Sequence, residues 1–183
     1  MEYRKIIALK NGRTCVLRSA TQEDARGVLN NFIRNHEQTD YLLTYPDEIT
    51  FTVEQEEKYL QAKTDSPNEA ELVAEVDGMI VGQAGIEALG RTDKMKHRAE
   101  FGISVDEAYW GLGMGRALTR ACIELARQAG YRQLELQAVA DNAPALALYA
   151  SEGFVEYGRN PRGFRSRRTG WQELVLMRRE LDP

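Results

Sequence analysis

Cysteine and histidine are scarce in this chain. Its 183 residues include two cysteines, Cys15 and Cys122, which lie far apart without Cys-x-x-Cys or Cys/His spacing. Neither a disulfide framework nor a zinc site is expected, and we predict that both are small core residues. The two histidines, His36 and His97, are isolated, and we interpret them as surface or loop residues. No metal is therefore expected.

Long hydrophobic runs are also missing. Residues 1–10 mix charges with short apolar pieces, whereas a signal peptide or a membrane span needs a longer apolar stretch. We therefore expect a cytoplasmic protein with no membrane partner. The formal net charge of −4 argues against nucleic acid as the main partner and would suit a cationic substrate.

Proline and aromatic residues are few, with five prolines and 8% aromatics. Charged residues make up 28% and hydrophobic residues 43%, a balance that excludes a disordered, fibrous or low-complexity chain. A chain of this length can bury a sizeable core in one unit. Because no repeat or linker divides the sequence, residues 1–183 are predicted to form a single domain.

The first third of the sequence predicts a strand and two helices. Residues 14–18 alternate like a strand, and Thr21-x-x-Asp24 resembles a capping box that opens a helix. Thr52-x-x-Gln55 caps a second helix, expected to run to about Lys63. Residues 38–49 have no clear period and are predicted to be a long connection, a kind of segment that is often functional.

From residue 71 onward the pattern favours strands. Two runs, 72–76 and 79–86, flank Asp77-Gly78, a dipeptide that favours a tight hairpin turn. Another strand is expected over 98–105, and helical spacing predicts a helix over 113–129. The remaining expected elements are a strand at 133–139, a helix at 142–152 and two closing strands near 154–158 and 171–177.

A glycine-rich turn follows the strand expected at 98–105. Its residues are Gly111, Leu112, Gly113, Met114, Gly115 and Arg116. Backbone N–H groups at a helix start attract phosphate oxygens, and glycine lets a phosphate approach closely; Arg116 would add a charged contact or lie solvated. A Walker A loop is excluded because no lysine follows, and a dinucleotide fingerprint because Arg116 replaces its third glycine. The alternative is a glycine turn without a ligand.

Two motifs in register resemble those of the GNAT acetyltransferase superfamily. The segment from Trp110 to Gly115 is similar to the family's Gln/Arg-x-x-Gly-x-Gly/Ala motif, with Trp110 in the first position as in many members. The segment from Asn142 to Phe154 is similar to the family's Asn-x-x-Ala-x-x-Leu-Tyr-x-x-x-Gly-Phe motif. The resemblance covers residues 71–177 well and the first helices loosely.

The resemblance implies an α+β fold, in which about four helices flank a V-splayed, mixed, mostly antiparallel sheet of about six or seven strands. The strands at 98–105 and 133–139 would part to admit the pantetheine arm of acetyl-CoA, the cosubstrate, and the glycine turn would bind its pyrophosphate. Backbone groups of Ile103, Ser104 and Val105 would pair with that arm. Asn142 would contact the coenzyme or serve only as a helix N-cap.

The same resemblance implies roles for side chains. Tyr149 would be the general acid that protonates the leaving thiolate, with a plain core tyrosine as the alternative. Glu100 is the first candidate for the base that takes the amine proton, with a structural or substrate-orienting carboxylate as the alternative. Some relatives have the base where this chain has Gln137, which cannot titrate. Glu173 would bind the amine or relay a proton through water.

The resemblance therefore implies an N-acetyltransferase that moves the acetyl group directly from acetyl-CoA to a primary amine of a small molecule or peptide. A backbone N–H near Ser104 or Val105 would stabilise the oxyanion. Acceptor specificity is expected in the loops 37–52 and 87–97. The alternatives are a protein N-terminal acetyltransferase and a non-catalytic acyl-CoA-binding sensor module. A homodimer is frequent in the family, although no apolar patch in the sequence indicates one.

The run 159–168 is the one basic cluster and contains five arginines around Gly163-Phe164. We predict a solvated loop between the last two strands. The alternative is a contact with an acidic substrate or with the ribose phosphate of the coenzyme.

Overall fold

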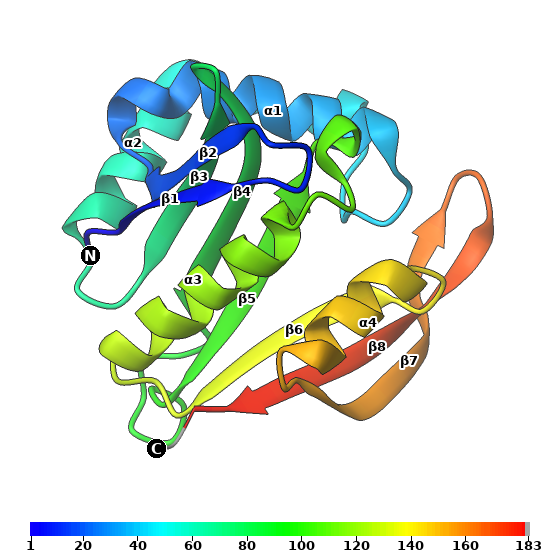
Figure 1. The fold of residues 1–183 in the computed structure, drawn as a ribbon. Helices are drawn as coiled ribbons and strands as arrows, with labels where there is room; N and C mark the ends of the chain where they lie inside the picture. The colour runs from blue at the N-terminus through cyan, green and yellow to red at the C-terminus, as the bar shows by residue number, and fades with distance from the viewer. Residues whose placement is uncertain (182–183) are drawn as a thin grey trace.

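One continuous sheet of eight strands organises the computed structural model, which describes residues 1–181 (Figure 1). The strand order is β1-β2-β3-β4-β5-β6-β8-β7, and only β5 and β6 are parallel. The predicted α+β architecture is confirmed, and the predicted number of strands, six or seven, is slightly low. The strands are β1 Arg4–Ala8, β2 Thr14–Ser19, β3 Ala70–Val76, β4 Met79–Ala88, β5 Arg98–Val105, β6 Gln133–Val139, β7 Val155–Ser166 and β8 Gly170–Glu180.

Four α-helices cover the two faces of this sheet, as expected. They are α1 Ala25–Gln38, α2 Val53–Asp65, α3 Met114–Gln128 and α4 Ala143–Ser151. Neighbouring residues of β4 define the faces: Gly82 lies against Met114 of α3, whereas Gln83 donates a hydrogen bond to the carbonyl of Val28 in α1 (2.8 Å). Because successive strand residues point to opposite faces, α1 and α3 lie on opposite sides. α2 packs beside α1, and α4 lies on the side of α3 (Figure 1).

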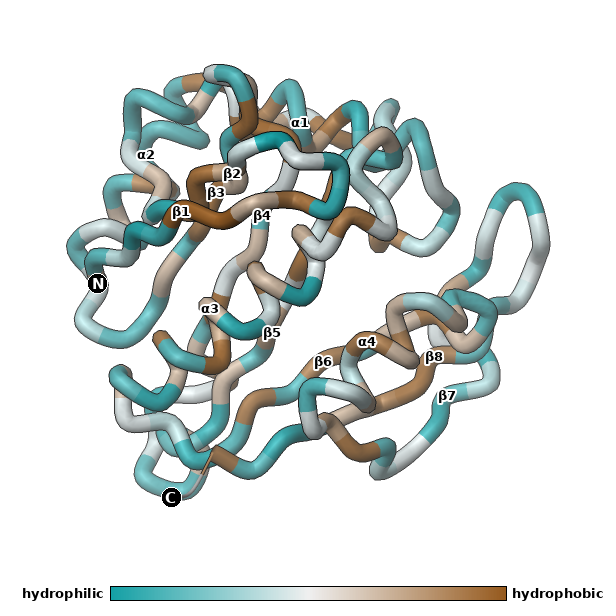
Figure 2. The backbone as a smooth tube through the Cα atoms, in the orientation of Figure 1, coloured by the Kyte–Doolittle hydropathy of each residue, from teal (hydrophilic) through white to brown (hydrophobic). Residues whose placement is uncertain are grey.

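Apolar residues concentrate along the strands, and the tip joining β7 to β8 is hydrophilic (Figure 2). The larger core cluster lies between the sheet, α3 and α4, and a smaller one lies under α1 and α2. Cys15 and Cys122 are 0% exposed, so their prediction as core residues is confirmed. None of the helices within residues 1–181 combines the length and apolar character that a membrane span requires.

The predicted capping boxes are present at both early helices. At α2, the Thr52 N–H donates to Gln55 Oε1 (2.8 Å) and the Gln55 N–H donates to Thr52 Oγ1 (3.3 Å). At the other site, the Thr21 N–H donates to Asp24 Oδ2 (2.8 Å), and the box opens a 3₁₀ turn, Gln22–Asp24, which leads into α1. These local bonds satisfy N–H groups that a helix start leaves without partners.

The prediction of a loop over residues 159–168 is wrong for most of that run. β7 continues to Ser166, and its pairing with β8 includes Phe164↔Gln172 and Ser166↔Gly170. The strand persists because β8 supplies hydrogen-bond partners along it and because aromatic rings hold its cations. Arg162 and Arg165 lie 5.4 Å and 5.5 Å from the ring centre of Trp171.

The interpretation of His36 as a surface or loop residue is also wrong. His36 lies in the last turn of α1 and is only 4% exposed. Its ring centre lies 4.0 Å from that of Phe32, and its Nδ1 lies 2.7 Å from the Phe32 carbonyl oxygen. Burial lowers the pKa of His36, which favours the neutral ring. His97 is exposed in the turn before β5, as expected.

Candidate active site

The sheet splits between its two central strands. β5 and β6 pair only over Arg98↔Gln133, Ala99↔Leu134 and Glu100↔Glu135. Beyond Glu100 and Glu135 the two strands diverge, as Figure 1 shows. Residues 101–105 and 136–139 therefore face each other across a gap without pairing, and the predicted V-shaped splay is confirmed.

The hydrogen-bond alternation of β5 decides which main-chain groups face this gap. The Asp106 N–H donates to the Val81 carbonyl on β4 (2.9 Å), and the same register continues along β5. In an antiparallel ladder, successive residues direct their main-chain groups alternately toward the partner strand and away from it. Ser104 therefore directs its N–H and C=O toward β4. Ile103 and Val105 direct theirs toward the gap.

The glycine turn combines an unusual backbone with open space beside it. Gly111 and Gly113 have φ values of +73° and +95°, which a side chain would strain, and a Cβ at either position would meet nothing within 4 Å. The first helical bond of α3 runs from the Ala117 N–H to the Gly113 carbonyl (3.1 Å). The N–H groups just before Ala117 therefore lack an acceptor within the helix, which is the arrangement that binds an anion.

The side chains around the turn anchor it to the fold. Met114 is completely buried under β4, and the Leu112 carbonyl accepts a hydrogen bond from the Lys10 N–H (3.1 Å) in the β1–β2 hairpin. Trp110 donates its indole N–H to the Val105 carbonyl (2.6 Å), which is one of the groups at the gap. A Cβ at Gly115 would lie 3.3 Å from Leu148, so a small residue there lets α3 approach α4 closely.

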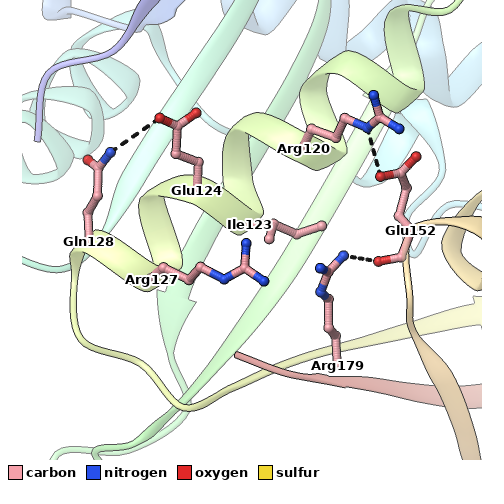
Figure 3. A pocket seen from close by; sticks show the side chains of 7 residues that line it. All are labelled: Arg120, Ile123, Glu124, Arg127, Gln128, Glu152 and Arg179. Carbon is pink, nitrogen blue, oxygen red and sulfur yellow. Dashed lines mark hydrogen bonds and ion pairs between the residues drawn. The ribbon is translucent and has the colours of Figure 1, made fainter. Parts of the chain in front are cut away.

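Arg116 is already engaged by the end of α4. Its Nε lies 3.2 Å from Glu152, and its Nη2 donates to the Ser151 hydroxyl (3.2 Å). Glu152 also pairs with Arg120 (2.8 Å). Figure 3 shows the adjacent pocket between α3 and β8, into which Arg127 and Arg179 point.

Asn142 caps α4. Its Oδ1 accepts a hydrogen bond from the Ala145 N–H (3.3 Å), which confirms the N-cap prediction. A contact of Asn142 or Arg116 with the coenzyme stays a prediction.

Tyr149 lies on the α3 side of the gap, in the apolar core. It is 8% exposed, and its ring centre lies 6.1 Å from that of Phe101 and 6.0 Å from that of Phe154. Burial raises the pKa of Tyr149 to about 12, so the phenol is protonated at neutral pH. Both predicted descriptions, a core tyrosine and a proton donor, are compatible with this position.

Glu100 lies on the other face. It precedes Phe101, whose ring packs near Tyr149, and successive strand residues point to opposite faces. Glu100 is the last β5 residue that pairs with β6, and it is exposed beside the gap. The pKa of Glu100 is raised by loss of hydration at the sheet and then by repulsion from Glu87 and Glu135. The split in the sheet thus has an uncharged phenol on one side and a carboxylate of raised pKa on the other.

Gln137, which stands where some relatives have the base, and Glu173, the predicted amine-binding residue, are separated by the fold. Gln137 is exposed and shares the face of Glu135, so it lies near Glu100 across the gap. Glu173 lies farther along the sheet, where its carbonyl accepts from the Ala140 N–H (2.8 Å), and its carboxylate pairs with Arg159 (2.8 Å). The structure does not bring Glu173 together with Glu100.

A contact that the sequence did not predict joins the loop after α1 to the β7–β8 hairpin. The carboxylate of Asp40 accepts hydrogen bonds from Ser166 Oγ (2.5 Å), Tyr45 Oη (3.2 Å) and Gln172 Nε2 (3.3 Å). We call these four residues the Asp40 clasp. A small pocket beside it is also lined by Leu42, Leu43 and Phe164. No sequence signal identified the clasp, because its two segments lie far apart along the chain.

The comparisons with known proteins agree with this geometry. The family model described as "Acetyltransferase (GNAT) family" matches residues 30–154. The chain is 42% identical over 118 residues to N-alpha-acetyltransferase RimI of Mycobacterium tuberculosis, covering 64% of this chain and 71% of that relative. It is 37% identical over 91 residues to L-amino acid N-acetyltransferase AaaT of Escherichia coli, covering 49% and 56% respectively. A GNAT-family acetyltransferase from Streptococcus pneumoniae superposes with a TM-score of 0.87 at 29% identity, over 91% of this chain and 99% of that one.

The matched region includes the split between β5 and β6, the glycine turn and helix α4. The gap offers main-chain groups to a pantetheine arm, and the turn offers free N–H groups to a pyrophosphate, so the residues present fit acetyl-CoA. The chain therefore belongs to the GNAT family and is an acetyl-CoA-dependent N-acetyltransferase.

Proposed function

We propose that this enzyme transfers the acetyl group directly to a primary amine of a small molecule or peptide, with Glu100 as proton acceptor and Tyr149 as proton donor. The observation that carries the proposal is the placement of these side chains on opposite faces of the sheet where β5 and β6 part. An amine that attacks a thioester held in the gap needs a base on its own side. The departing sulfur needs an acid on the other side.

The coenzyme would be held mainly by main-chain groups. In the turn 111–116, the N–H groups that have no acceptor at the start of α3 would bind the pyrophosphate, and Ile103 and Val105 would bond to the pantetheine arm. Ser104 directs its main-chain N–H and C=O toward β4, so it would hold β5 in place and would not itself bond to the arm. Arg116 would reach the phosphates after leaving Glu152, and Asn142 would contact the coenzyme from the start of α4.

The reaction begins when Glu100, directly or through water, takes a proton from the ammonium group. The nitrogen lone pair then attacks the thioester carbon, a C–N bond forms, and negative charge develops on the carbonyl oxygen. A main-chain N–H of Val105 or Ile103 would donate to that oxygen. The C–S bond then breaks and Tyr149 gives its proton to the sulfur. Of the two protons that the ammonium loses, one passes through Glu100 to solvent and the other replaces the proton given by Tyr149.

The pKa values of acid and leaving group need to approach each other for this last step. The pKa of Tyr149 is about 12, whereas an ordinary thiol has a pKa of about 8.5. Burial disfavours the thiolate as it does the phenolate, so a sulfur inside the gap is a stronger base than it is in water. Burial thus raises the pKa of the leaving thiol as well as that of Tyr149, and the difference between the two pKa values is smaller than it would be for a thiol in water.

The acceptor would approach on the face of Glu100, between the loop after α1 and the β7–β8 hairpin. Two acceptor classes are supported by the relatives, since one is named for N-alpha-acetylation and another for acetylation of L-amino acids. Acetylation of a protein N-terminus is the second candidate, favoured by the 42% identity to RimI. Glu173 alternates along β8 with Gln172, which bonds to Asp40, so its carboxylate and Arg159 lie on the face of α4 and would not contact an acceptor beside Glu100.

The test is thiol release from acetyl-CoA with a panel of L-amino acids, polyamines, aminoglycosides and N-terminal peptides. We expect turnover with at least one class, and in Glu100→Gln and Tyr149→Phe a loss of kcat of about 10²-fold or more. Glu57→Gln, an exposed position on α2, and Tyr131→Phe, whose hydroxyl bonds to Asn68, are the matched controls. Binding of acetyl-CoA without turnover across the panel would instead support the sensor module. Full activity of both active-site variants would remove the proposed roles.

A further inference from the structure

Three carboxylates stand in a row across the sheet at the split. Glu87 of β4 is directly opposite Glu100 of β5, which is directly opposite Glu135 of β6. Directly opposite residues have Cβ atoms about 4.5–5.5 Å apart, and like charges in this position destabilise a sheet. A fold that keeps this row bears an electrostatic cost that three neutral residues would avoid.

The two outer carboxylates are each held by a cation. Glu87 accepts from Lys63 Nζ (2.7 Å) and from the Tyr59 hydroxyl (2.9 Å). Partial burial disfavours the charge of Glu87, but these bonds outweigh it, and the pKa of Glu87 is lowered. Its negative charge is therefore fixed at neutral pH.

Glu135 is held in the same way on the other side. Its carboxylate forms a two-pronged ion pair with Arg98 (Nη2 to Oε2, 2.7 Å) and accepts from Gln133 Nε2 (2.9 Å) and the Tyr157 hydroxyl (3.1 Å). Its burial also disfavours the charge, and Arg98 outweighs it, so the pKa of Glu135 is lowered. Glu135 is only slightly exposed, which limits screening by water.

Glu100, in the middle of the row, has a different electrostatic environment. Across residues 1–181 no cation forms an ion pair with it, and its pKa is raised. The next position along the same face has Glu71 on β3, whose pKa is raised by burial to about 8, so it adds little charge at neutral pH. The helix α1 presents the neutral Asn35 to β5. The other titratable or charged groups on this face near Glu100 are Lys63 and Tyr59 of α2, Glu69 before β3, Arg98 of β5, Tyr157 of β7 and Arg178 of β8.

We propose that Glu87 and Glu135 are positioning residues that hold Glu100 between two fixed negative charges and so make it a stronger proton acceptor. The inference rests on the proposed function, in which Glu100 takes the amine proton. Lys63 and Arg98 keep the outer charges ionised, and their ion pairs turn the cations toward the outer carboxylates. A base is most effective when its pKa approaches the working pH, and the row moves Glu100 in that direction.

The experiment compares the pH dependence of kcat/KM for wild type, Glu87→Gln and Glu57→Gln. Removing the charge of Glu87 lowers the pKa of Glu100, so the acid limb of the profile should move to lower pH. When each profile is divided by its own plateau value, kcat/KM on the acid limb should be about twofold to fivefold higher for Glu87→Gln than for wild type. Glu57→Gln makes the same chemical change at an exposed position of α2 and should leave the limb in place. The free amine titrates identically in every assay, so a displaced limb belongs to the enzyme.

A direct titration of Glu100 by carbon-13 NMR of labelled glutamate side chains, assigned with Glu100→Gln, gives a readout without substrate. We expect the same downward displacement in Glu87→Gln, and also in Glu135→Gln if that variant retains the thermal stability of wild type. An unmoved Glu100 titration in Glu87→Gln overturns the inference, as does an effect confined to the KM of the amine, which would make the row an ammonium-binding surface. If Glu100→Gln keeps the activity of wild type and the acid limb of its pH profile, the proposed function has failed. If Glu100→Gln loses the activity and the acid limb while Glu87→Gln leaves the pKa of Glu100 unchanged, only this inference has failed.

Discussion

The two halves of the sheet differ in how they are covered. In the first half, β1 to β5, the central strands are covered on both faces: β3 packs against α2 and β4 against α1 on one side, and both pack against α3 on the other. β6, β8 and β7 pack against α4 on one face, while on the other Leu176 is half-buried and Gln137 is exposed. The Asp40 clasp and the curled end of β7, where Gly163 lies against Leu174, cover the rest of that face.

This difference explains why the active site lies between the halves. β5 packs against α3 on one face and pairs with β4, which is covered on both faces, so its main-chain groups form a rigid wall although Glu100 and Gly102 are exposed. The second half is joined to β5 through three residue pairs and has a polar, partly open face on the side where we propose that the acceptor binds. We infer that the first half carries most of the stability and that the second half adapts to the acceptor, and each of the following experiments tests that division.

The largest effect is expected from matched leucine truncations in the two halves. Leu118 of α3 is 0% exposed and packs against β4, so Leu118→Ala should lower the free energy of unfolding by about 2–5 kcal/mol. Leu176→Ala, on the half-open face of β8, should cost about 1 kcal/mol or less. Urea denaturation of the two variants measures both values. Equal losses would mean that the halves do not differ in this way.

The next effect concerns the pH dependence of stability in the first half. Glu71 has its pKa raised to about 8, first by burial, so folding favours its protonated form. The resulting stabilisation is complete below the pKa of the unfolded chain, about 4.3, and is lost as the pH rises through 8. Glu71→Gln should therefore raise the free energy of unfolding by about 4 kcal/mol at pH 8 and by about 1 kcal/mol at pH 5. Thermal melts at both pH values measure this gain, with Glu57→Gln as the control. A gain in stability of the same size at pH 5 and pH 8 would contradict the prediction.

Much of the fold was predictable because its signals are local. The two capping boxes, the Asp77-Gly78 hairpin and the glycine turn each depend on residues within a few positions of one another. Backbone geometry is fixed at that range, so the sequence indicates it directly. The roles of Tyr149 and Glu100 came from the resemblance to the GNAT superfamily, and they stay predictions.

The features that were not predicted depend on contacts between distant residues. The row of Glu87, Glu100 and Glu135 exists only through strand register, and the clasp joins Asp40 to Ser166. β1 is a short edge strand with charged residues, so its pattern is weak until β2 pairs with it. His36 is a polar residue in a helix end, and only the packing of Phe32 shows that it is buried.

A smaller effect is expected at the join between the halves. Gly113 has φ +95° and open space at its Cβ position, so Gly113→Ala places a methyl group where a phosphate would lie and strains the turn. We expect about tenfold weaker binding of CoA by calorimetry, with a loss of stability of about 1 kcal/mol. Gly130→Ala, at φ +84° after α3, has the same strain without the phosphate. If that control weakens CoA binding equally, the strain and not the site explains the loss.

The smallest effect tests the connection between the halves on the acceptor side. Asp40→Asn retains the size of the side chain but weakens its bonds to Ser166, Tyr45 and Gln172. The clasp bridges the two walls beside the acceptor and does not contact the glycine turn, so the KM of the amine should change by about threefold while the affinity for CoA stays constant. Asp47→Asn removes an exposed ion pair with Arg167 between the same two segments and should change little. A change in kcat at constant KM would show instead that the clasp acts on the split between β5 and β6, and the second half could then no longer be treated as an independent acceptor wall.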